Sequence, residues 1–231
     1  MKLRDVGPTA ILEGFAVLVG VLLAFWVESA GQDRQDAERA ARLLSALRAE
    51  IQVNAAQLDE RIADAAQEIA LIDSVFGAVV LPPAGVTPTP EDVTNVVSWI
   101  GPVVLQPYQR GALDDLLTSG GLPLVQDDQV RQMVLEYARM LDREAGRQEN
   151  GVDFWNDHLS GYYFEHANIA GFIVAGRLGL ESLPPSVGAF VNSRRFANLL
   201  AERRAIVNRL RAARVTLKEH VDSMIVLLPG G

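Results

Sequence analysis

The chain begins with one uninterrupted apolar run and continues with amphipathic segments. Residues 11–27 (ILEGFAVLVGVLLAFWV) contain a single ionisable side chain, Glu13. With the three residues before it, the run reaches about 20 residues, the length of a helix that spans the hydrocarbon core of a bilayer. We therefore expect a short N-terminal tail over 1–10, a transmembrane helix over 11–28 and an extramembrane domain over 29–231.

A cleaved signal peptide is the main alternative for this run, because Lys2 and Arg4 give it a basic start. The run is, however, longer than the roughly 7–15 apolar residues of a signal core. The nearest small residues, 29–31, follow Trp26 and Glu28 and form no small-x-small cleavage pattern. An uncleaved anchor therefore fits the sequence better.

Beyond the run, apolar positions recur every seven residues. One set is Leu44, Ile51, Leu58, Ala65 and Ile72, and neighbouring positions hold Leu47, Ala55, Ile62, Ile69 and Phe76. The opposite face carries Glu50, Gln57, Glu60, Asp64 and Gln67. This pattern predicts an amphipathic helix over about 33–76, continuous with the transmembrane helix. Its apolar stripe is wider than the seam of a two-stranded coiled coil, which indicates packing in a helical bundle.

A second long helix is expected near the C-terminus, over about 193–228, where Asn192 or Ser193 can cap its start. Its apolar side can cover the stripe of the first long helix if the two run antiparallel. Five arginines in its middle would then face an acid-rich partner: Arg203, Arg204, Arg209, Arg211 and Arg214.

The region between the two long helices contains a proline-rich loop at 81–90 and several shorter helices within 91–170. The shorter helices are expected over 91–99, 109–118, 127–147 and 154–169, and Asp127 and Asp128 can cap the third. No segment of alternating apolar and polar residues indicates a sheet. The fold class is therefore predicted to be all-α, with one N-terminal transmembrane helix that continues into a long helix of an extramembrane helical bundle.

Composition narrows the chemistry. The formal net charge is −8, which disfavours nucleic acid and anionic lipid as main partners. The chain has no cysteine, so thiol chemistry is excluded. His158 and His166 stand eight residues apart, about 12 Å along a helix, too far to share one metal ion. No nucleophile or phosphate-binding motif occurs. We expect no catalytic residues, no metal and no cofactor, and hence no enzyme.

An aromatic-rich segment offers the one candidate for ligand binding. It contains Phe154, Trp155, Tyr162, Tyr163 and Phe164. Three interpretations stay open: an aromatic core at helix crossings, a belt at the membrane interface, or a ligand pocket between bundle helices.

Small residues at Ala16, Gly20 and Ala24 share one face of the predicted span. A ridge of small residues lets two helices approach closely in lipid, although such residues are also common in spanning helices in general. We expect the lipid bilayer as a partner, together with either a second copy of this chain or another membrane protein.

Three stretches resemble an uncharacterised family of bacterial single-pass membrane proteins, a domain of unknown function. They are the glutamate-led span from Glu13 to Val27, the central pattern from Tyr108 to Leu122 with its Ser119-Gly120-Gly121, and Phe196 to Leu200 at the start of the last helix. The tryptophan that usually follows the span is absent, and Trp26 lies inside it instead. The resemblance implies an N-terminal anchor and a helical extramembrane domain. It implies no activity and no site residues.

These observations predict a membrane-anchored helical scaffold or accessory subunit that acts through protein–protein contacts. The alternative is an extracytoplasmic ligand-sensing helical bundle that signals through a partner. A short tail stays inside easily, and a long domain is translocated largely regardless of its charge. We therefore expect the bacterial inner membrane, with a cytoplasmic N-terminus and a periplasmic C-terminal domain.

Overall fold

A computed structural model describes residues 8–77, 84, 105, 107–166 and 193–229, and the side chains of all these except 8–14 and 16. Every regular element within these residues is a helix, which confirms the predicted all-α class. The loop predicted at 81–90, apart from Ala84, and the helix predicted over 91–99 lie outside the described residues. So do the last three residues of the helix predicted over 154–169.

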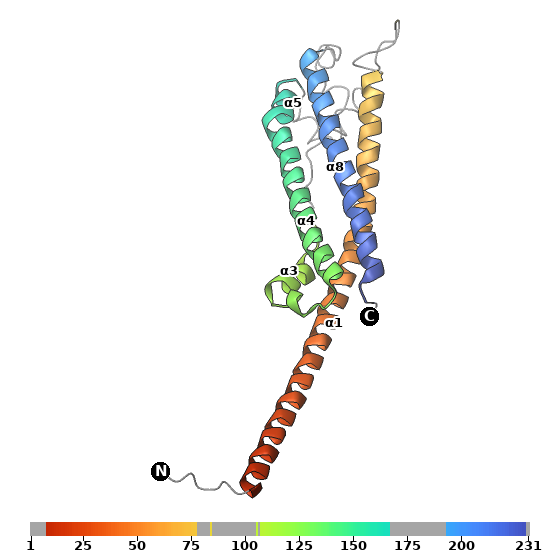
Figure 1. Ribbon diagram of the computed structural model, residues 1–231. Coiled ribbons are helices and arrows are strands. Elements are labelled where there is room, and N and C mark those ends of the chain that lie inside the picture. The colour runs from red at the N-terminus through yellow and green to blue at the C-terminus, as the bar shows by residue number, and fades with distance from the viewer. Residues whose placement is uncertain (1–7, 78–83, 85–104, 106, 167–192, 230–231) are drawn as a thin grey trace, which may run out of the picture.

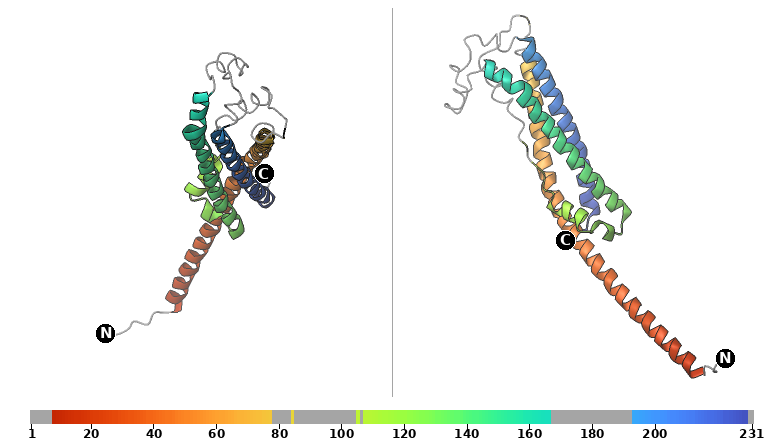
Figure 2. Two further views of the ribbon diagram at one scale, coloured as in Figure 1. Left: turned by 90° about the horizontal axis from the view of Figure 1, so that it is seen from above. Right: turned by 90° about the vertical axis from the view of Figure 1, so that its left-hand side faces the viewer.

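The first helix, α1, runs without a break over Pro8–Val75, 68 residues. At 1.5 Å per residue it is about 100 Å long. It therefore includes both the predicted span and the long amphipathic helix predicted beyond it. In Figure 1 the N-terminal part of α1, in red, projects away from all other helices, and the two views of Figure 2 show the same projection.

The C-terminal half of α1 packs against α8, which covers Arg194–Leu227. The two helices are antiparallel, because Glu68 pairs with Arg203 near the start of α8 while Arg48 donates to the Leu228 carbonyl at its end. The Ser193 hydroxyl caps α8 by accepting a hydrogen bond from the Phe196 amide. The expected antiparallel pairing of the two long helices is confirmed.

Helix α8 is the centre of the bundle, since it also packs against α4, Asp128–Phe154. The carboxylate of Asp127 accepts hydrogen bonds from the amides of Gln129 and Val130 and caps α4. α4 is longer than the predicted helix that ended near Arg147. It continues through a π-helical turn, η3 (Trp155–Leu159), into α5, Ser160–His166.

Two short elements, α3 (Gly111–Thr118) and the 3-10 turn η2 (Leu122–Leu124), pack on α1 where it leaves the bundle. Gly120 joins them with a φ of 74°, which favours glycine. At Gly121, a Cβ atom would clash with Cδ1 of Leu43 on α1, so the Leu43 side chain would have to shift. The Ser119-Gly120-Gly121 sequence therefore serves a tight turn and a close approach to α1.

The hydrophobic core lies between α1, α3, α4 and α8. The heptad positions of α1 enter it: Leu44, Leu47, Ile51, Ala55 and Leu58 are all buried in one cluster. Opposite them the cluster contains Leu113, Leu116, Val134, Tyr137, Leu141, Leu217, Val221 and Met224.

Two assignments of polar faces were wrong. Glu50, expected on the exposed face of α1, is buried, because α3 covers that side of the helix. The arginines of α8 do not all face α1 either. Arg203 and Arg204 pair with Glu68 and Asp73, whereas Arg214 pairs with Glu144 of α4.

Leu58 is fully buried in the core. We expect Leu58→Asp to lower the free energy of unfolding by at least about 3 kcal/mol, because the substitution places an unpaired carboxylate in the core. Asp64→Ala, at an exposed position of the same helix, should change it by less than about 0.5 kcal/mol. Chemical unfolding of the full chain in mild detergent, followed by circular dichroism, measures both. Equal losses in the two variants would show that the faces of α1 are assigned wrongly.

Candidate functional site

An exposed apolar helix is the most unusual surface of this molecule. All described side chains from 15 to 35 are exposed. Within 15–27 they include Phe15, Val17, Leu18, Val19, Val21, Leu22, Leu23, Phe25, Trp26 and Val27, and Trp26 is 71% exposed. Consecutive positions of a helix point in all directions, so this segment is apolar on every side. Soluble monomers rarely expose apolar area of this extent, which marks the segment as a contact surface.

Within the described part of the chain, no helix has a stretch that is both long and apolar enough to cross a bilayer. Part of the predicted span, namely the side chains of 11–14 and 16, lies outside the residues described.

Of the three residues predicted for helix packing in the membrane, Gly20 and Ala24 are exposed on α1, and the Ala16 side chain lies outside the described residues. A Cβ atom built at Gly20 would meet nothing within 4 Å. This face of α1 is therefore unoccupied by the rest of the described chain.

A second group of residues fixes α3 to α1. The Glu50 carboxylate accepts hydrogen bonds from the amides of Ala112 (2.7 Å) and Leu113 (3.2 Å). These amides belong to the first turn of α3, which has no partner for them within its own helix. A carboxylate also interacts favourably with the positive end of a helix dipole. Glu50 thus replaces the side-chain cap that Arg110, at the N-cap position, does not provide.

Asn54, one helical turn after Glu50, continues this polar contact. Its amide group donates to the Gln109 carbonyl (2.7 Å) and its Oδ1 accepts from the Gln109 amide (2.9 Å). It also bonds the hydroxyl of Tyr137 on α4 (2.8 Å). Asn54 and Tyr137 are both fully buried. Through them, α1 holds the segment before α3 and α4 in one register.

Buried ion pairs continue the polar contact along the bundle. Arg203 of α8 lies 2.6 Å from Glu68 of α1 and is 3% exposed. Arg214 of α8 lies 2.7 Å from Glu144 of α4, and it also donates to the Arg61 carbonyl at 3.4 Å. Each pair joins two different helices, so each of them specifies which helices are neighbours and in which register.

Arg61 departs from this pattern. It is 8% exposed, and its guanidinium lies over the ring of Tyr108, 4.3 Å from the ring centroid. No carboxylate among the described residues is within ion-pair distance of it. Burial raises the pKa of the Tyr108 hydroxyl, although the charge of Arg61 opposes the shift. The cation–π contact orients Arg61, whose Nη1 atom has no hydrogen-bond partner among the described residues.

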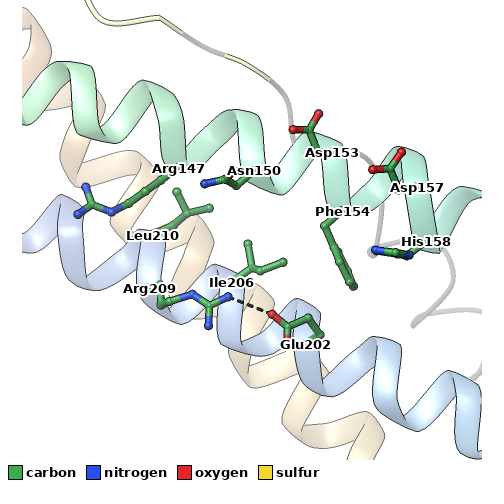
Figure 3. Close-up of a pocket in the computed structure, with 10 residues that line it drawn as sticks. All are labelled: Arg147, Asn150, Asp153, Phe154, Asp157, His158, Glu202, Ile206, Arg209 and Leu210. Atoms are coloured by element: carbon green, nitrogen blue, oxygen red, sulfur yellow. Dashed lines mark hydrogen bonds and ion pairs between the residues drawn. The ribbon is translucent and has the colours of Figure 1, made fainter.

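A groove of 490 Å³ lies between α4 and α8. Its floor is apolar: Phe154 of α4 faces Ile206 and Leu210 of α8 across the groove (Figure 3). Polar side chains form its rim, namely Arg147, Asn150, Asp153, Asp157, His158, Glu202 and Arg209. Arg209 and Glu202 form an ion pair of 3.0 Å along α8. The groove can hold a small molecule with an apolar part, and Phe154 of the predicted aromatic segment lines it.

Three other aromatic side chains of the segment, Trp155, Tyr162 and Tyr163, pack at the end of the bundle. Trp155 contacts Tyr163 with ring centroids 5.4 Å apart, and Tyr162 stacks on Phe196 of α8 at 5.8 Å. Tyr163 is buried, which raises the pKa of its hydroxyl. Phe164 is exposed. The π-helical turn η3 lies between Phe154 and these residues and shifts the phase of the helix, a feature that is frequent at functional sites.

The three histidines contact different residues. The His158 ring contacts Phe154 with centroids 5.5 Å apart, and His166 lies against Tyr162 and Glu165. His220 shares a hydrogen bond with the Met133 carbonyl. The described residues contain no group of histidine, aspartate or glutamate side chains able to hold a metal ion.

Comparison of the chain with protein-family models, with curated proteins and with solved structures yields no match in any of the three.

The sequence did not reveal the roles of Glu50, Asn54 and Arg61. Their spacings of four and seven residues place them on one side of α1, next to the apolar stripe, and this spacing was the only available signal. Partners for the three come from 107–113 and, for Asn54, also from Tyr137 of α4, and the place of these partners against α1 depends on the tertiary fold.

Tyr137 makes the buried polar contact sensitive to high pH. Burial raises the pKa of its hydroxyl to about 12, and Asn54 opposes the shift. An unfolded tyrosine titrates near pH 10, so the unfolded chain loses this proton first. The stabilisation is therefore complete below about pH 10 and falls between about pH 10 and 12.

We expect Tyr137→Phe to lower the free energy of unfolding by about 1 kcal/mol at pH 8, since a buried hydrogen bond is lost. As the pH rises from 10 to 12, wild type alone should lose stability, with a slope of up to about 1.4 kcal/mol per pH unit, so the difference should shrink and then change sign. Urea unfolding at a series of pH values measures it. A difference independent of pH would contradict the raised pKa.

Proposed function

We propose that the protein is a membrane-anchored helical scaffold or accessory subunit that acts through protein–protein contacts. The observation that carries this proposal is the exposed apolar segment of α1, which no other described part of the chain covers. Water is an unfavourable solvent for ten large exposed apolar side chains, whereas lipid tails solvate them on all sides. Glu13, the one ionisable residue in 11–27, is near the start of the segment, within reach of the headgroups.

The continuity of α1 supports a scaffold. One helix enters the bundle directly from the apolar segment, without a loop between them. A rotation or shift of the N-terminal part is therefore transmitted to the bundle by a stiff rod. The bundle end nearest the apolar segment carries α3, η2 and the last residues of α8, so these elements face the membrane side and any membrane partner.

We place the chain in a bacterial inner membrane, with the N-terminus in the cytoplasm and the bundle in the periplasm. A short N-terminal tail with Lys2 and Arg4 favours retention inside. The acidic balance of the chain is consistent with a domain whose partners are proteins rather than nucleic acid.

A ligand-sensing bundle is the second candidate. The groove between α4 and α8 favours it, since an apolar floor with a polar rim is typical of small-molecule sites. A ligand there would bridge α4 and α8, and α8 would pass a shift to α1, to which the buried ion pair between Arg203 and Glu68 joins it. Such a sensor would signal through a partner protein.

The anchor is tested by extraction of membranes with alkaline carbonate, followed by N-terminal sequencing of the retained protein. We expect the chain to stay in the membrane pellet and to keep its first residues, because the apolar segment is uninterrupted and has no good cleavage site. Recovery of a soluble chain that begins near Gly31 would mean that the segment is a signal peptide.

The small-residue ridge is tested with Gly20→Ile in the full chain. Gly20 and Gly31 are both exposed on α1 with no atom near a built Cβ, so neither substitution disturbs the folded monomer. Gly31→Ile, beyond the apolar segment, is therefore the matched control. If Ala16, Gly20 and Ala24 join two copies, Gly20→Ile should shift the mass measured by light scattering in mild detergent from dimer to monomer, and Gly31→Ile should not.

A monomeric wild type would exclude self-association through this ridge. The better partner would then be the spanning helix of a different membrane protein.

A further inference from the structure

The groove between α4 and α8 combines an apolar floor with a charged rim. Its volume is 490 Å³, and its described lining comes entirely from α4, η3 and α8. Ile206 and Leu210 are buried in the floor, and Phe154 lies half-buried beside them. A volume of this size and an apolar floor suit a small ligand rather than a single ion.

Three charged side chains of the rim are available to a ligand. Glu202 and Arg209 neutralise each other, because they form an ion pair of 3.0 Å on α8. Arg147 is partly exposed, and Asp153 and Asp157 are exposed. None of these three forms an ion pair within the described part of the chain, so the rim has one free cation and two free anions from α4 and η3.

The free charges of opposite sign lie toward opposite ends of the groove. In Figure 3, Arg147 is at one end and Asp157 at the other, with Phe154 between them. Arg147 is six residues from Asp153 and ten from Asp157, or about 9 and 15 Å along the helix. A ligand that pairs with both signs therefore needs two charges of its own, roughly 9–15 Å apart, with an apolar body between them.

We propose that the groove binds a short peptide of three or four apolar residues, an inference that rests on the second candidate function, in which the groove is a ligand site. An extended chain spans about 3.3–3.6 Å per residue, so three or four residues cover about 10–14 Å. The peptide carboxylate pairs with Arg147, and its ammonium group pairs with Asp153 and Asp157. Its apolar side chains pack on the floor of the groove.

Length and charge distinguish a short peptide from other small ligands. A free amino acid carries both charges, but they are attached to one carbon atom and cannot reach both ends of the groove. A fatty acid or an alkyl amine covers the floor but pairs with only one sign of charge. Because the rim is exposed, each ion pair adds little to the affinity. The floor provides most of the binding free energy, and the rim sets the direction of the peptide.

The test is calorimetric titration of the full chain in mild detergent with trileucine, with titration into detergent alone as the blank. N-acetyl-trileucine keeps only the carboxylate, and trileucine amide keeps only the ammonium group. Triglycine keeps both charges but has no apolar side chain. We expect trileucine to bind with a Kd below about 1 mM, each blocked analogue to bind about two- to fivefold more weakly, and triglycine not to bind measurably.

Charge variants assign the two ends of the peptide. Arg147→Gln should weaken trileucine about two- to fivefold and leave trileucine amide unchanged, since the amide has no carboxylate to lose a partner. Asp153→Asn combined with Asp157→Asn should weaken trileucine and leave N-acetyl-trileucine unchanged. A folding defect would weaken every ligand, so this pattern separates recognition from a structural effect.

Arg139→Gln and Glu149→Gln are the matched controls, since both positions are exposed on α4 and lie outside the groove. Both should bind trileucine as wild type does. The proposal is overturned if trileucine does not bind, or if triglycine or both blocked analogues bind as tightly as trileucine. It is also overturned if both charge variants keep the wild-type affinity for trileucine.

The failure of the peptide site and the failure of the proposed functions are distinguishable. The membrane anchor is decided by carbonate extraction, whatever the groove binds. Trileucine binding that leaves the contacts of the chain with a partner protein unchanged would support the peptide site and exclude the sensor.

Discussion

The antiparallel contact between α1 and α8 is the constraint on which the rest of the structure depends. α1 is too long and too apolar along one stripe to exist alone in water beyond residue 40, and α8 covers that stripe. Hydrophobic contacts alone would allow the two helices to slide by a turn. The pairs Glu68–Arg203 and Asp59–Lys218, together with the bond from Arg48 to the Leu228 carbonyl, are satisfied in one register only.

Buried polar groups then assign the remaining elements to their places. Arg214–Glu144 connects α8 to α4, Glu50 binds the first turn of α3, and Asn54 bonds both the Gln109 backbone and Tyr137. Each of these groups lies where loss of one partner would leave the other buried and unsatisfied. A wrong arrangement of the helices would leave these groups buried without partners, and the resulting loss of free energy is larger than the gain from the bonds in the correct arrangement. Arg61 is the exception, because its buried guanidinium lies against the ring of Tyr108 and forms no ion pair with a described carboxylate.

The sequence predicted the helices better than it predicted their contacts. Heptad spacing correctly selected Leu44, Leu47, Ile51 and Leu58 as core positions. An apolar stripe of that width must be buried, and this holds without knowing which helix packs against it. The capping residues Asp127 and Ser193 were visible for a similar reason, since capping is a local interaction.

What could not be predicted is non-local. The burial of Glu50 depends on α3, which is 62 residues away along the chain, and Arg214 selects α4 rather than α1 because α8 lies between both helices. The π-helical turn at Trp155–Leu159 inserts an extra residue into a helix whose sequence pattern does not show it. As a result, the aromatic segment separated into one groove residue, Phe154, and a packed cluster around Tyr162 and Tyr163.

The central claim is that one continuous helix passes from lipid through water into the bundle. The chain contains no cysteine, so single spin-labelled cysteines can be placed along α1 without background. The measurement is their accessibility to oxygen, which concentrates in lipid, and to a water-soluble nickel complex, in lipid nanodiscs.

We predict oxygen access at all positions from 17 to 27 and nickel access from 29 to 38. From Ala40 onward, access should alternate with the helical period of about 3.6 residues. Nickel access throughout 17–27 would contradict the claim.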